Sequence, residues 1–167
     1  MTTRYLQKLL RYRAWADQLT YGAVAALPEG VAETVRATIF GTMLGTLGHT
    51  YVVDDIFQAH LQGRPHGYAS RKLPEPLSLD ELWRRQQAMN DWYLAYAQGL
   101  SAGQAAEEVS FQFIGGGEGR MSREEMILHV VNHATYHRGF VADMFYQVPA
   151  KPPATDLPVF LRDVAPS

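Results

Sequence analysis

Three of the six histidines in this 167-residue chain lie in one short segment, at His129, His133 and His137. Residues four apart on an α-helix share one face, with Cβ atoms about 5–6 Å apart. Two imidazoles at that spacing can bind one metal ion, each at about 2.0–2.1 Å. Six histidines predict roughly 0.2 pairs with this spacing by chance, yet two such pairs overlap here. The spacing therefore indicates a metal site.

Helical geometry limits this segment to two ligands. At 3.6 residues per turn, positions four apart drift by about 40° per step, so His129 and His137 lie about 80° and two turns apart. We expect His133 and His137 to bind the ion. We expect His129 to lie beside the site, because metal-bound imidazoles usually need an outer acceptor or an orienting neighbour.

The third ligand has to come from another helix. His49 lies midway along a predicted helix, among apolar and small residues, where a buried imidazole normally needs a polar partner. A metal shared with His133 and His137 would satisfy that need. Three histidines plus a water are typical of catalytic rather than structural zinc. The alternative is that no metal binds and the histidines form a polar network in the core.

The elements that must position these histidines are four long helices. Apolar residues recur at helical spacing in four segments, which predict helices over residues 3–27, 39–62, 78–100 and 122–147. Four amphipathic helices with two longer connections predict an all-α fold, a four-helix bundle, and such bundles build metal sites from facing helices. The alternating segment before the glycine-rich residues 115–119 predicts a short β-hairpin between the third and fourth helices.

Local signals support these helix ends. The serines at Ser78 and Ser122 are each followed three residues later by glutamate, which predicts two capping boxes. Gly63 suits the left-handed residue that follows a helix. We find no internal repeat or linker and therefore predict a single domain over residues 1–167. Its proline-rich tail, residues 150–167, contains a segment at 157–161 that could dock against the bundle.

Composition excludes several classes of function. The net charge is −2 without a basic run, so there is no electrostatic footprint for nucleic acid or an anionic membrane. The absence of cysteine excludes disulfides, thiolate zinc ligands and cysteine nucleophiles. The N-terminus lacks the features of a signal peptide, and no run of 18 apolar residues predicts a membrane span. We expect a soluble, cytoplasmic protein.

Three segments resemble the DinB/YfiT-like superfamily of metal-dependent proteins. Residues 12–19, Tyr-Arg-Ala-Trp-Ala-Asp-Gln-Leu, are similar to that family's Tyr-Asn-x-Trp-Ala-Asn pattern, and His49 is the single histidine expected in the middle of the second helix. Residues 128–139, Leu-His-Val-Val-Asn-His-Ala-Thr-Tyr-His-Arg-Gly, are close to its Asn-His-x-x-Tyr-His-Arg-Gly signature. The resemblance extends over nearly the whole chain.

The resemblance implies a four-helix bundle in which His49, His133 and His137 bind nickel or zinc. Because proteins of this family are frequently homodimers, it also implies a homodimer. The chain differs from the family's pattern in two places, neither of which touches the ligands. Phe140 follows the signature where many members have glutamine, and helix one has Arg13 and Asp17 where asparagines are common. Both differences could alter what lies beside the open coordination position.

The motif excludes one class of metalloenzyme and leaves others open. A zincin protease needs glutamate directly after the first histidine as its general base, and Ala134 occupies that position. The remaining chemistry is Lewis-acid catalysis or activation of a bound water or thiol, in a transferase or hydrolase. Characterised members of the family that the chain resembles include transferases and isomerases that use low-molecular-weight thiols such as bacillithiol or mycothiol. We therefore expect a small-molecule substrate and a thiol cosubstrate, or alternatively a non-enzymatic, stress-related protein with a structural ion.

Few other residues offer chemistry. Asp17 and Tyr136 are candidates for acid–base or orienting work, although an ion pair for Asp17 and packing for Tyr136 are the simpler interpretations. Arg138 points about 100° away from the adjacent ligand and would anchor a carboxylate across a helix. Gly139 would permit close approach by another helix or subunit. The remaining histidines, His60 and His66, flank a loop and should be solvated.

Overall fold

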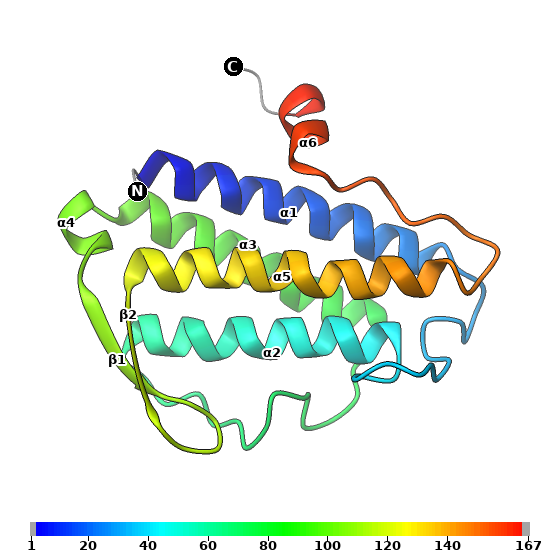
Figure 1. Ribbon diagram of the computed structural model, residues 1–167, viewed down its shortest axis with the longest axis horizontal. Coiled ribbons are helices and arrows are strands. Elements are labelled where there is room, and N and C mark those ends of the chain that lie inside the picture. Colours follow the sequence, from blue (N-terminus) through cyan, green and yellow to red (C-terminus); the bar gives the residue numbers. More distant parts are fainter. Residues whose placement is uncertain (1–2, 165–167) are drawn as a thin grey trace.

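The computed structural model describes residues 3–164, and most of them are helical (Figure 1). Four long helices lie side by side, with α1 and α5 running in one direction and α2 and α3 in the other. The predicted all-α bundle is thereby confirmed. The long helices are α1 (Thr3–Ala25), α2 (Met43–Gln62), α3 (Leu79–Gly99) and α5 (Arg123–Phe145). The smaller elements are α4 (Ala102–Ala105), β1 (Glu108–Gln112), β2 (Glu118–Ser122) and α6 (Leu157–Asp163).

Helix α2 begins four residues later than its apolar pattern predicts. Thr42 precedes it in an extended conformation, with φ −134° and ψ 165°, and its hydroxyl accepts a hydrogen bond from the backbone N–H of Gly45 at 2.8 Å. This cap satisfies a backbone donor that the first turn leaves free and so fixes the start of the helix. At the other end, Gly63 takes the predicted left-handed conformation, with φ 67°.

Of the two predicted capping boxes, one is complete. At the start of α5, Ser122 accepts from the backbone of Glu125, whose carboxylate accepts from Ser122 N at 2.7 Å. At the start of α3, Ser78 accepts from Glu81 N at 3.2 Å, but the Glu81 carboxylate binds two nearby arginines instead of returning to the cap. Thus α5, which carries two of the candidate ligands, has the more fully capped N-terminus.

The predicted hairpin is present between α4 and α5. Its strands pair antiparallel, from Glu108 opposite Ser122 to Gln112 opposite Glu118. The turn contains three consecutive glycines, residues 115–117, with φ between 92° and 98°, a conformation that L-residues with a side chain rarely adopt. The ring of Phe111 lies over Gly119, where a Cβ atom would come within 2.5 Å of it. The glycines are therefore explained by the hairpin's own geometry.

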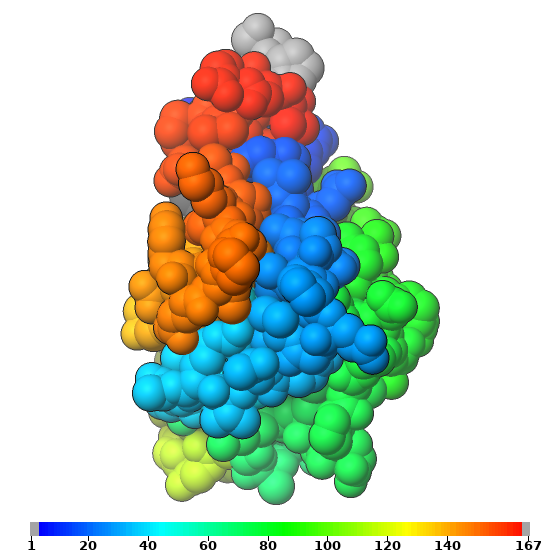
Figure 2. Space-filling view, turned by 90° about the vertical axis from the view of Figure 1, so that its right-hand side faces the viewer, coloured from blue at the N-terminus to red at the C-terminus, as the bar shows by residue number. Residues whose placement is uncertain are grey.

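The segment after α5 returns along the bundle and covers part of α1 (Figures 1 and 2). Phe160 of α6 is buried against Tyr12 and Trp15, with ring centroids 5.8 and 5.5 Å away. The hydroxyl of Tyr12 donates to the carbonyl of Thr155 at 2.8 Å. Docking of residues 157–161, which the sequence allowed, is confirmed. The short helix α4 was not predicted.

Two apolar clusters lie between the four long helices, and a third, small one contains Tyr12, Ala16 and Phe160 where α6 packs on α1. The larger of the first two includes Val53, Tyr93 and Ile127, all at most 4% exposed, and it extends to Phe111 of the hairpin. The smaller of the first two lies toward the other end of the bundle and includes Met43, Leu82 and Phe145. Among residues 3–164, no helix is both long enough and apolar enough to cross a membrane.

Candidate metal centre

The three predicted ligands come together between α2 and α5. One ring nitrogen each of His49, His133 and His137 lies within 4.8 Å of the other two. The Nε2 atoms of His49 and His133 are 3.1 Å apart. The His137 ring centroid is 4.5 Å from that of His49 and 4.4 Å from that of His133. The structure therefore contains a group of three histidines that can hold a divalent metal ion.

The orientation of His49 suits a metal ligand. Its Nδ1 lies 2.7 Å from the backbone carbonyl of Arg71, and a carbonyl can only accept, so Nδ1 carries the proton. The lone pair is then on Nε2, which faces His133. A hydrogen bond that fixes the tautomer in this way is the usual support of a metal-bound imidazole. The donor set of neutral nitrogens fits zinc, nickel and related ions.

Burial keeps these imidazoles neutral. Burial first, and then the neighbouring histidines, lower the pKa of His133 to about 2 and that of His137 to about 4. The pKa of His49 is also lowered, first by burial and then by the positive charge of Arg71, against an opposing effect of its backbone hydrogen bond. At neutral pH all three rings therefore keep a free lone pair, which protons do not compete for.

An aromatic side chain that the sequence analysis overlooked covers one side of the group. The Phe40 ring stacks on His49 at a centroid distance of 4.1 Å and meets His137 edge-on at 5.4 Å. Phe40 lies in the connection between α1 and α2, whereas the apolar pattern predicted that the helix already begins at residue 39. It shields the site from that side.

The remaining histidine of the α5 motif, His129, lies next to the group without joining it. It is one turn before His133 on α5, and the two ring centroids are 5.5 Å apart. Its ring packs against Phe57 at 4.4 Å, and burial lowers its pKa. This is the neighbouring position that helical drift predicts.

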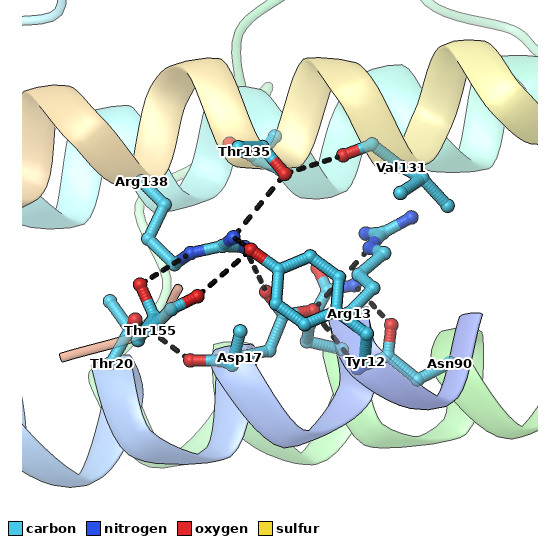
Figure 3. Close-up of polar contacts among 12 residues, drawn as sticks. Tyr12, Arg13, Asp17, Thr20, Asn90, Val131, Thr135, Arg138 and Thr155 are labelled. Carbon is cyan, nitrogen blue, oxygen red and sulfur yellow. Dashed lines mark hydrogen bonds and ion pairs between the residues drawn. The ribbon is translucent and has the colours of Figure 1, made fainter. Parts of the chain in front are cut away.

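The two candidates for acid–base work, Asp17 and Tyr136, do not belong to the group of three histidines. Tyr136 is 64% exposed, and its ring packs edge-on against His137 and Phe140 on the outside of α5. Asp17 is buried among α1, α3 and α5, where its carboxylate accepts from Asn90 at 3.0 Å (Figure 3). Asp17 also lies 3.5 Å from Arg13, so the ion pair that the sequence suggested for Asp17 and the packing suggested for Tyr136 are both present.

Asp17 belongs to a buried polar layer that also contains Arg138 (Figure 3). The guanidinium of Arg138 donates to the Tyr12 hydroxyl at 2.8 Å and to the Thr155 hydroxyl at 3.1 Å, and it lies 4.0 Å from Asp17. Arg138 thus anchors α5 to α1 as expected, but mainly through hydroxyl groups. A Cβ atom on Gly139 would meet nothing within 4 Å, so within the described chain no helix approaches it closely.

A second part of this layer was missed from the sequence. Arg13, 1% exposed, donates to the fully buried carboxylate of Asp54, which also accepts from Gln86 at 3.0 Å. Burial raises the pKa of Asp54, and the charge of Arg13 opposes that effect. The Tyr93 hydroxyl donates to the Asp54 carbonyl at 2.7 Å. The only signal available was an acidic residue on an otherwise apolar face of α2.

A cavity of about 310 Å³ lies beside the three histidines and reaches His133. It lies between α2, α5, β1 and the loop after α2. Its lining residues are Val53, Ile56, Phe57, His60, Arg71, Phe111, Gln112, Phe113, Ile114, His129 and His133.

The structure corrects the prediction that His60 is solvated. His60 is half-buried and stacks on Phe111 at 4.8 Å, because the hairpin folds back over the end of α2. It therefore lines the same cavity as His133. His66 is also partly buried, and its Nδ1 accepts from Tyr68 N at 3.0 Å, outside the cavity.

The helical bundle and its three converging histidines define the class of protein. The model of the DinB family matches residues 1–165, so the chain belongs to the DinB family. Among curated proteins, it is similar to Protein DinB of Bacillus subtilis (strain 168). The two are 25% identical over 165 residues, an alignment that covers 92% of each chain.

Proposed function

We propose that this protein is a metal-dependent enzyme that acts on a small molecule, with its ion bound by His49, His133 and His137. One observation carries the proposal: three neutral imidazole nitrogens converge beside a cavity, and the described residues add no fourth histidine, cysteine or carboxylate to the group. Three protein ligands leave a coordination position open, which is typical of catalytic sites.

Other residues of the chain orient a ligand, shield the metal site and provide room for a substrate. The Arg71 carbonyl holds the His49 ring in its tautomer, and Phe40 shields the group on one side. The cavity next to His133 has room for a substrate. An ion bound here would supply Lewis acidity or lower the pKa of a bound water or thiol.

Within this class we favour a thiol-dependent transferase or isomerase that uses zinc or nickel and a low-molecular-weight thiol. A soft thiolate binds readily to such a metal. The chain's resemblance to a superfamily with thiol-dependent members supports the same choice. A hydrolase using the same open position is the next possibility.

The second candidate function is a non-enzymatic metal-binding protein with a structural ion. The position of the ligands favours it, because His49 on α2 and the pair on α5 would let one ion join two helices that are distant in sequence. Such an ion would stabilise the fold and would need no access for a substrate.

Cobalt(II) distinguishes the two candidates, since its visible spectrum reports changes in its ligands. We expect glutathione to change the spectrum of the cobalt-loaded protein in a saturable way, because a thiolate would enter the open position. His137→Ala, which removes one ligand, provides the control and should not form the cobalt spectrum. If cobalt stabilises the protein but neither glutathione nor other small anions change its spectrum, the structural function is correct and the enzymatic one is wrong.

A further inference from the structure

The cavity beside His133 is walled by aromatic rings from three separate elements. Phe57 of α2 packs against His129 of α5 at a centroid distance of 4.4 Å and against Phe111 of β1 at 5.8 Å. His60 stacks on Phe111 at 4.8 Å, and Phe113 meets Phe111 edge-on at 5.0 Å. Aromatic rings prefer offset-stacked or edge-to-face partners. A flat apolar group is thus the shape that these walls suit.

The charge around the cavity is positive. No aspartate or glutamate of the described chain is among its lining residues, whereas Arg71 is. The Arg71 carbonyl binds His49, so this residue lies at the end of the cavity nearest the three histidines. Arg71 is exposed, which leaves its guanidinium free to meet a ligand from solvent. A guanidinium binds carboxylates and related anions through well-oriented, charge-assisted hydrogen bonds.

We propose that this cavity binds a small molecule with a planar aromatic body and one anionic group. The body lies between the rings of Phe57, Phe111 and Phe113, and the anionic group points toward Arg71 and the histidines. The inference rests on the proposed function in one respect, since it takes the cavity to be the substrate pocket of the same site.

The size and charge of the cavity exclude a folded partner and disfavour a cation. A volume of about 310 Å³ is at the lower end of the range for small-molecule pockets and is too small for a folded partner. Aromatic cages also bind quaternary ammonium ions, but a cation would be repelled here by Arg71. An uncharged aromatic molecule would gain the ring contacts without the interaction with Arg71.

Three probes that share one ring system separate these contributions. Calorimetric titration of the metal-free protein with 2-naphthoate, 2-naphthylmethanol and 2-naphthylmethylammonium measures the effect of charge alone. Arg71→Gln removes the cation, with Arg84→Gln on exposed α3 as its matched control. Phe113→Ala removes a ring that is 54% exposed, so the fold should tolerate it, and Tyr146→Ala removes a 74% exposed ring elsewhere.

We expect naphthoate to bind about tenfold more tightly than the alcohol, as one charge-assisted hydrogen bond allows. Arg71→Gln should remove that preference without weakening the alcohol, and Phe113→Ala should weaken both ligands several-fold. Both control variants should bind like the wild type. Equal binding of naphthoate and alcohol, tighter binding of the ammonium compound, or no naphthoate binding would overturn the proposal. Because these titrations use metal-free protein, their failure is distinguishable from a failure of metal binding.

Discussion

The Nε2 atoms of His49 and His133 lie 3.1 Å apart, although the two residues are 84 positions apart in the chain. His49 has its proton on Nδ1, bound to the Arg71 carbonyl at 2.7 Å. Its lone pair therefore faces a second imidazole whose pKa is lowered to about 2. Together with His137, these two nitrogens can bind a metal ion strongly, whereas they bind a proton only weakly.

The metal-free protein should lose stability as the pH falls from about 7 toward 4. In the unfolded chain these histidines have a pKa near 6.5, whereas the folded pKa is about 4 for His137 and about 2 for His133. Between those values the unfolded state binds more protons, so acid favours unfolding. Urea unfolding at several pH values measures the slope, which His133→Gln should reduce. A stability independent of pH in this window would show that the histidines are not held neutral.

Divalent zinc should raise the melting temperature of the wild-type protein. A ligand that binds only the folded state stabilises it by about 2.7 kcal/mol when present at 100 times its Kd. His49→Ala removes one of the three ligands and should abolish most of the shift. His66→Ala, which removes a histidine outside the group, should retain it. An equal shift in both variants would place the ion elsewhere.

Arg13→Met should destabilise the protein by about 3–5 kcal/mol, because it leaves the buried carboxylate of Asp54 without its charge partner. Adding Asp54→Asn to this variant should restore part of the loss, since the amide carries no charge. Chemical denaturation of the single and double variants measures both effects. If the double variant is no more stable than Arg13→Met alone, the buried charge is not the cause.

Ser122→Ala should cost about 1 kcal/mol of stability, since it removes the N-cap of the helix that carries His133 and His137. Ser110→Ala, at an exposed position on β1, is the matched control and should have little effect. Thermal unfolding compares the two. Equal effects would mean that the capping box does not hold the start of α5.

The sequence predicts the parts of this protein that depend on local periodicity. The spacing of His133 and His137 places them on one face of a helix, and a single histidine in the middle of an apolar helix identifies His49. Their convergence requires that α2 and α5 pack side by side in a particular rotation. That rotation depends on the whole core and cannot be predicted from local periodicity. The resemblance to a known family provided the expectation that the three histidines converge.

The parts that the sequence analysis missed depend on contacts between distant segments. Arg71 belongs to a loop, whose path no hydrophobic period defines. Phe40 lies in a connection that the apolar pattern had assigned to the second helix. In the sequence, Phe111 is an ordinary strand residue. Its contact with His60 exists only because the hairpin packs over α2. The burial of Asp54 follows from Arg13 on another helix, and a charged residue seen alone is normally assigned to the surface.

The metal content of protein purified without an affinity tag tests the central claim most directly. Elemental analysis should find about one zinc or nickel ion per chain in the wild type, as a single three-ligand site requires. The same amount is expected in His66→Ala and almost none in His137→Ala. Equal metal content in the wild type and His137→Ala, or no metal in the wild type even after incubation with zinc and nickel, would contradict the site.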